Sequence, residues 1–268
     1  MELFALSWLG GRFLTFSSIA FHKNGMGEGV QVKRSVEVAE GRGARVRRLF
    51  PTRSFDSLDP FVLFDEFYVE KPAGFPAHSH AGFEFITYMI EGSMVHEDSM
   101  GNREEIPAGG VQHAVTGSGI SHSELPGGEG LNHGMQLWIN LPRSRKNEKP
   151  SYTVLQPHKL RRESFEWGIA TFIADERLLT LSTPVDYLDV RIQKGKVYKG
   201  TVNAGYSSLI YVLWGEMEVG EATVKPHEAA VLQPGMSLRA RMLADTRFVY
   251  LSGKPLGEPI RVRGSRVE

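Results

Sequence analysis

The chain has 268 residues, 31 basic side chains balance 31 acidic ones, and 41% of the residues are hydrophobic. This composition is typical of a globular protein with one large domain or two ordinary ones. The balanced charge gives no overall positive field, so we expect no direct nucleic-acid partner. Cysteine is absent, which excludes disulfides, thiolate metal sites and cysteine nucleophiles and indicates a reducing, cytoplasmic location.

The N-terminal segment, residues 1–29, begins with an apolar run that lacks the features of a secretory signal. Glu2 stands where such signals carry positive charge, and Gly10 and Gly11 interrupt the run. We interpret the segment as an N-terminal extension or a mis-assigned start upstream of Met26, with an extra strand or short helix on the body as the alternative. No other apolar stretch is long enough to span a bilayer, so we expect no membrane partner.

From residue 30 onward the sequence is typical of short β-strands. Apolar runs over residues 85–90 and 209–213 are bounded by Gly, Pro, Asn and Asp, and residues 135–140 alternate between two faces. No segment shows a long, capped helical period. The pattern therefore predicts an all-β sandwich or barrel.

An internal repeat predicts two such barrels. Residues 88–95 are echoed by residues 211–219, and each copy is followed by a turn that contains proline and glycine. We expect an N-terminal barrel over residues 30–141, a linker over residues 142–157 and a C-terminal barrel over residues 158–268. We also expect a monomer.

Two pairs of potential metal ligands stand about forty residues apart in the first repeat. They are His78 and His80, then His122 and Glu124. Residues i and i+2 of a strand project from the same face, so each pair can place two donor atoms side by side, and two such strands facing one another across a barrel would offer all four to one cation. Three imidazoles and one carboxylate suit Fe²⁺, with Mn²⁺, Zn²⁺, Ni²⁺, Cu²⁺ and Co²⁺ as alternatives.

The second repeat does not carry these ligands. Aligning Tyr88 with Tyr211 sets Thr201 and Asn203 opposite His78 and His80, and no pair like His122 and Glu124 follows. We therefore expect the metal in the N-terminal barrel alone. Four protein ligands on an octahedral ion would leave two positions open for O₂ and an oxygen donor of the substrate.

Four segments of the first repeat resemble the pirin family of the cupin superfamily: GFPAHSHAGFE (74–84), EGSMVHED (91–98), TGSGISHSELP (116–126) and HGMQLWINL (133–141). The resemblance runs from about Val32 through the second barrel. It implies two cupin-type barrels (double-stranded β-helices) in tandem, with one Fe²⁺ held by His78, His80, His122 and Glu124. Gln112 stands where the general cupin pattern has a later histidine, as is usual in pirins.

Other polar residues near these motifs are interpreted either as part of the site or as structural. Glu84 has the same parity as His78 and His80, so we expect it beside the metal as a candidate catalytic acid or base, with Glu124 as the second catalytic candidate. His113 is out of phase and is read as structural. His96 precedes a turn and is expected to close a hairpin, and His133 is expected at the surface. No residue is assigned to an organic cofactor.

The resemblance implies two activities. Pirin relatives reported as quercetin 2,3-dioxygenases imply a non-haem iron dioxygenase that acts with O₂ on small flavonol- or enol-type aromatic substrates. Eukaryotic pirins imply instead an iron-dependent, redox-sensitive regulatory protein that binds a protein partner without turnover. A metal that only stabilises the barrel is a third reading.

Overall fold

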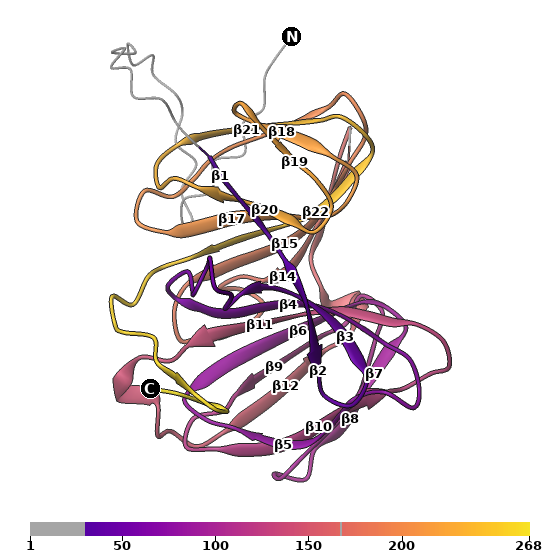
Figure 1. Cartoon of the computed structure of the whole chain (residues 1–268), viewed down its shortest axis with the longest axis vertical. Helices are drawn as coiled ribbons and strands as arrows, with labels where there is room; N and C mark the ends of the chain where they lie inside the picture. The colour runs from indigo at the N-terminus through magenta and orange to yellow at the C-terminus, as the bar shows by residue number, and fades with distance from the viewer. Residues whose placement is uncertain (1–29, 167) are drawn as a thin grey trace.

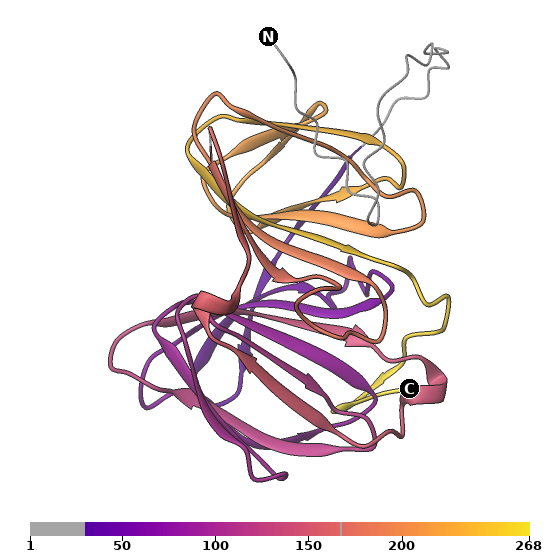
Figure 2. The same cartoon turned by 180° about the vertical axis from the view of Figure 1, so that it is seen from behind.

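The structure, a computed structural model, describes residues 30–166 and 168–268, so the predicted N-terminal extension lies outside the described residues. Regular structure in these residues is almost all strand, with two short 3₁₀ helices, η1 (Arg143–Arg145) and η2 (Pro157–Lys159). Two barrels stack along the long axis of the molecule (Figures 1 and 2). The prediction of two β-barrels in tandem is confirmed. No helix in residues 30–166 or 168–268 is long and apolar enough to cross a bilayer.

The N-terminal barrel, the lower one in Figure 1, consists of two antiparallel sheets. The seven-stranded sheet has the order β12 (Ser151–Leu155), β9 (Val111–Val115), β6 (Phe83–Glu91), β11 (Asn132–Asn140), β4 (Phe61–Val69), β3 (Ala44–Phe50) and β2 (Val36–Glu40). The four-stranded sheet has the order β5 (Phe75–His80), β10 (Ile120–Pro126), β7 (Ser93–Asp98) and β8 (Arg103–Pro107).

The C-terminal barrel repeats this architecture. Its seven-stranded sheet has the order β1 (Gln31–Arg34), β20 (Glu228–Leu232), β17 (Ser207–Trp214), β22 (Thr246–Gly253), β15 (Val185–Ile192), β14 (Gly168–Ala174) and β13 (Arg162–Phe165). Its four-stranded sheet has the order β16 (Val197–Thr201), β21 (Ser237–Met242), β18 (Met217–Val219) and β19 (Ala222–Val224).

The expected domain boundaries are wrong at three places, because the barrels exchange chain segments. Strand β1, expected in the first barrel, pairs with β20 of the second. Strand β12 falls within the expected linker and completes the large sheet of the first barrel through β9. The hairpin of β23 (Val262–Arg263) and β24 (Arg266–Val267) follows the second barrel in sequence but bridges to Ala81 of the first.

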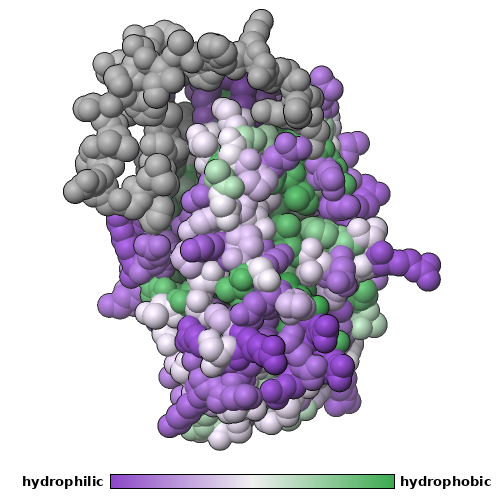
Figure 3. All heavy atoms as spheres, turned by 90° about the vertical axis from the view of Figure 1, so that its left-hand side faces the viewer, coloured by the Kyte–Doolittle hydropathy of each residue, from purple (hydrophilic) through white to green (hydrophobic). Residues whose placement is uncertain are grey.

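The two seven-stranded sheets pack against each other through one apolar layer. A single cluster of buried side chains draws on both barrels, including Phe61, Phe64, Ile86, Leu137 and Ile139 from the first and Tyr187, Leu209, Val249 and Leu251 from the second. The face in Figure 3 shows the lower barrel largely hydrophilic outside, with hydrophobic residues gathering over the upper barrel and the level where the barrels meet.

Two buried tyrosines cross this layer in reciprocal fashion. The Tyr88 hydroxyl donates to the Asp189 carboxylate at 2.9 Å, and the Tyr211 hydroxyl donates to the Glu66 carboxylate at 2.8 Å. Tyr88 and Tyr211 are equivalent positions of the sequence repeat. Each barrel therefore satisfies a buried carboxylate of the other, as buried polar groups require.

The Glu66 carboxylate, which accepts the hydrogen bond from Tyr211, lies at the centre of a polar network. Its carboxylate also contacts Tyr68 at 2.7 Å, His133 at 2.9 Å and His227 at 2.8 Å. Burial alone raises the pKa of Glu66, but the hydrogen bonds from His133, His227 and Tyr68 outweigh burial and hold it at about 2. His133, expected at the surface, is instead part of this polar contact.

We expect Glu66→Gln to lower the free energy of unfolding by about 3 kcal/mol, because it removes one member of a buried charged network. The pKa of Glu66 is depressed in the folded state, so its stabilisation is complete above about pH 4.5 and is lost as pH falls toward 2. Urea unfolding between pH 2 and 7 measures both effects. The exposed Glu70→Gln is the control, and an E66Q protein with wild-type acid sensitivity would contradict the prediction.

Candidate metal centre

The three histidines of the two predicted pairs meet on neighbouring strands. In the antiparallel register of β5 and β10, His122 lies opposite His78, and His80 lies opposite Ile120. The ring centroid of His122 is 4.5 Å from that of His78 and 5.0 Å from that of His80. The strands are neighbours in one sheet, whereas we had expected them to face each other across the barrel.

Glu124 follows His122 on β10 after an irregularity in the register with β5. Its buried carboxylate accepts hydrogen bonds from the side-chain amides of Gln112 and, at 3.0 Å, Gln136. Gln112 is held in turn by the Tyr152 hydroxyl at 3.0 Å, and the Trp138 indole donates to Gln136 at 3.0 Å. These amide donors orient the carboxylate, which lies beside His96 and His122.

The donor atoms of this cluster suit a cation. Burial, followed by repulsion from the neighbouring histidine rings, lowers the pKa of His80 and of His122 to about 3, so both are neutral at pH 7. One ring nitrogen of each, His80 Nδ1 and His122 Nε2, is buried without a hydrogen-bond partner. Neutral imidazoles with unsatisfied buried nitrogens are the state that metal binding requires.

The orientation of His78 supports the same conclusion. Its Nδ1 lies 2.8 Å from the carbonyl oxygen of Pro76. A carbonyl only accepts, so Nδ1 carries the proton and the lone pair is left on Nε2. Such a hydrogen bond from one ring nitrogen commonly fixes the tautomer of a metal-binding histidine.

A fourth histidine, His96, belongs to this cluster and was missed by the sequence analysis. Its side chain is fully buried, stacks on Tyr152 at 4.1 Å and places Nδ1 3.4 Å from Nδ1 of His122. Within the described residues two groups could hold an ion, His78 with His80 and His122, and His96 with His122 and Glu124. The alternation of β7 was the available signal, because it turns His96 inward while the turn begins only after Asp98.

The expected position of Glu84 is wrong. Its buried carboxylate contacts His113 Nε2 at 2.8 Å and accepts the backbone N–H of Ser182, a residue of the other half of the chain, at 2.8 Å. Glu84 and His113 thus lie on the face of the sheet that meets the C-terminal barrel. The parity count failed because Gly82, with φ of 82°, lies in the turn between β5 and β6 and interrupts the side-chain alternation.

The histidine cluster opens into a cavity of about 530 Å³. Apolar and aromatic groups line it, among them Val62, Leu63, Phe75 and Trp138, and the Trp138 ring stacks on Phe83 at 4.0 Å. Arg48 forms a two-pronged hydrogen bond to Asp65 on its wall, at 2.9 and 2.7 Å. The volume lies within the range of small-molecule sites.

The C-terminal hairpin supplies part of this cavity wall. Val262, Gly264 and Ser265 line the cavity, and the backbone of Ser265 hydrogen-bonds the His80 ring. Lys146 anchors the hairpin by donating to the carbonyl oxygen of Val267 at 3.1 Å. Groups from both ends of the chain therefore surround the candidate metal centre.

Several known proteins are similar to this chain in sequence and in fold. The family model described as Pirin matches residues 43–139, and that described as Pirin C-terminal cupin domain matches residues 187–267. Pirin from Homo sapiens is 37% identical over 254 residues, 89% of this chain and 88% of the human protein. A pirin-like protein from Solanum lycopersicum is 36% identical over 82% of this chain and 79% of its own length.

Solved structures agree with these sequence matches. Quercetin 2,3-dioxygenase from Acinetobacter baumannii has a TM-score of 0.83 at 27% identity, covering 91% of this chain and 92% of that one. Bacterial pirin YhhW from Escherichia coli, solved in complex with nickel(II), has the same fold with a TM-score of 0.71 at 19% identity, covering 85% of this chain and 99% of that one. The cupin-type barrels expected from the sequence are confirmed.

We expect His80→Ala and His122→Ala each to weaken metal binding by more than about 100-fold, beyond the loss typical of groups that only support a ligand. Elemental analysis and competitive titration with a chromophoric chelator measure the effect. His113→Ala is the matched control and should keep its metal. His96→Ala should show a loss of about 10- to 100-fold, since it contacts His122. Stoichiometric metal in H80A, or loss of metal in H113A, would refute the ligand set.

Glu84→Gln should keep its full metal content, because the carboxylate faces the other barrel. It should lower the free energy of unfolding by about 1–3 kcal/mol, since a buried hydrogen-bonded network loses its charge. Glu124→Gln is the contrasting variant and should lose metal. Metal loss in E84Q with unchanged stability would show that Glu84 acts at the centre after all.

Proposed function

Because this chain belongs to the pirin family of the cupin superfamily, we propose that it is a mononuclear Fe²⁺ dioxygenase that acts on flavonol- or enol-type aromatic substrates. The observation that carries the proposal is the set of neutral, unsatisfied histidine nitrogens beside an oriented carboxylate, at a cavity lined by both apolar and polar side chains. The likeness to a quercetin 2,3-dioxygenase structure supports the same reaction class.

His78, His80, His122 and Glu124 would hold the ion in this proposal. Three imidazole nitrogens and one carboxylate suit Fe²⁺, and they also accept Mn²⁺, Co²⁺, Ni²⁺, Cu²⁺ or Zn²⁺. When bound, the ion would supply Lewis-acid and redox chemistry at the coordination positions that the four protein ligands leave open. Gln112 and Gln136 hold the Glu124 carboxylate in place beside His122.

The cavity walls would bind and orient the substrate. The Trp138 face, edge-on to His80 at 4.8 Å, offers a flat apolar surface beside the metal ligands. Leu63, Val62 and Phe75 add apolar contacts and exclude water. Glu124 is the carboxylate in this cavity that contacts the histidines, so we assign to it the acceptance of the proton from a substrate hydroxyl as well as metal binding.

The proposal predicts O₂ consumption that depends on a flavonol. Protein loaded anaerobically with Fe²⁺ should take up one O₂ for each quercetin lost, followed by an oxygen electrode and by flavonol absorbance. His80→Ala should abolish the uptake with the metal, and His113→Ala should retain both. Chelation should stop the reaction, and added Fe²⁺ should restore it.

The alternatives give different results in the same assay. A fully metal-loaded protein that consumes no O₂ over a panel of flavonols and enols would contradict the dioxygenase proposal. A redox-dependent affinity for a protein partner would then support the regulatory function, whereas a loss of thermal stability alone on metal removal would support a structural ion.

A further inference from the structure

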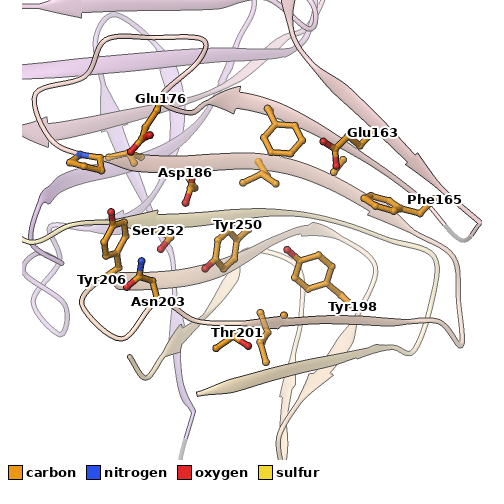
Figure 4. Close-up of a pocket in the computed structure, with 17 residues that line it drawn as sticks. Glu163, Phe165, Glu176, Asp186, Tyr198, Thr201, Asn203, Tyr206, Tyr250 and Ser252 are labelled. Carbon is orange, nitrogen blue, oxygen red and sulfur yellow. The ribbon is translucent and has the colours of Figure 1, made fainter. Parts of the chain in front are cut away.

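The C-terminal barrel contains a second cavity, of about 230 Å³, between its two sheets. Figure 4 shows its lining residues converging from several strands of this barrel and the neighbouring loops. Thr201 and Asn203 line it, and these are the repeat positions equivalent to His78 and His80. The second barrel therefore has a cavity at the equivalent place, with Thr201 and Asn203 where the first barrel has His78 and His80.

Aromatic rings form much of the wall. Tyr198, Tyr206, Tyr250, Phe165 and Phe172 all line the cavity. Tyr250 lies on β22 and its hydroxyl is hydrogen-bonded by Ser252 and Ser208, while Tyr198 lies on β16 in the opposite sheet. Ring faces fixed on both sides of a cavity attract cations as well as apolar groups.

Carboxylates supply the charge of the cavity. Asp186, Glu163 and Glu176 line it, and no Lys, Arg or His is among the lining residues. Asp186 is partly buried and Glu176 is exposed, and the ion pairs of Arg161 within the described residues go to Glu163 and Asp175. Burial first, and then the charges of Asp175 and Glu176, raise the pKa of Asp186 to about 6, while the charge of Arg161 lowers it. One cation, Arg161, therefore serves three carboxylates around this wall.

We propose that this cavity binds a small organic cation, an ammonium group carried on an apolar or aromatic body, with Asp186 as counter-ion and the Tyr198 and Tyr250 rings as walls. A partly buried carboxylate such as Asp186 gains from a cation that replaces its lost water. An anionic ligand is repelled by the same groups, and a neutral aromatic leaves Asp186 unpaired. The site is separate from the metal centre and does not depend on its reaction.

The experiment compares three probes of similar shape on the full-length, metal-loaded protein. Phenethylammonium, phenethyl alcohol and phenylpropionate differ mainly in charge, and calorimetry or ligand-observed NMR measures each affinity. We expect a dissociation constant below about 1 mM for the ammonium, at least about 10-fold weaker binding of the alcohol, and no detectable binding of the carboxylate. Equal affinity for all three, or no binding of the ammonium, would overturn the proposal.

Substitutions in the cavity test whether the ammonium probe binds there. Asp186→Asn should weaken the ammonium at least about 10-fold and leave the alcohol unchanged, and Tyr198→Leu should weaken both. The exposed Glu221→Gln on the same barrel is the control. Metal content should stay the same in all three, which separates failure at this site from failure at the metal centre. Unchanged ammonium affinity in D186N would refute the counter-ion, and if a variant does not fold, the comparison of probes on the wild-type protein still decides.

Discussion

The reciprocal hydrogen bonds of Tyr88 to Asp189 and of Tyr211 to Glu66 fix how the two barrels sit on each other. An apolar layer by itself permits sliding, because its free energy depends on buried area more than on direction. Each buried tyrosine hydroxyl reaches its carboxylate in one register only, and loss of that register costs the hydroxyl this acceptor. Tyr88 and Tyr211 are equivalent positions of the sequence repeat, so the interface contains two equivalent tyrosine–carboxylate hydrogen bonds, one donated by each barrel.

Strand β6 connects this interface to the metal centre. Ile86 and Tyr88 belong to the apolar layer between the barrels. Phe85 and Thr87 have the opposite parity: the Phe85 ring lies 5.2 Å from that of His122, and Thr87 accepts a hydrogen bond from Gln112 at 2.9 Å. Gln112 in turn orients Glu124. A displacement of β6 toward the other barrel would therefore move Glu124, a candidate metal ligand. The geometry of the site thus depends on a rigid interface between the barrels.

The sequence predicted the parts of this arrangement that depend on local patterns. Alternation and the repeat predicted two β-barrels. Of the two i, i+2 pairs, the structure brings the three histidines into one group and places Glu124 in a second group with His122 and His96. Glu84 could not be placed, because a glycine turn between β5 and β6 resets the side-chain alternation. Exchange of β1 and of the C-terminal hairpin was equally hidden, since a strand's own residues do not specify which distant strand it will pair with. The role of His96 depended on a neighbour, His122, that only the folded sheet brings near.

The C-terminal hairpin completes the wall of the cavity beside the candidate metal ligands with residues that come late in the chain. During synthesis the four candidate ligands and most of the first barrel emerge early, whereas Val262 and Ser265 are added after the whole second barrel. Without these residues the cavity beside His78 and His80 lacks one part of its wall. The cavity of the first barrel is therefore complete only when a hairpin from beyond the second barrel lies against it, so its shape depends on both barrels.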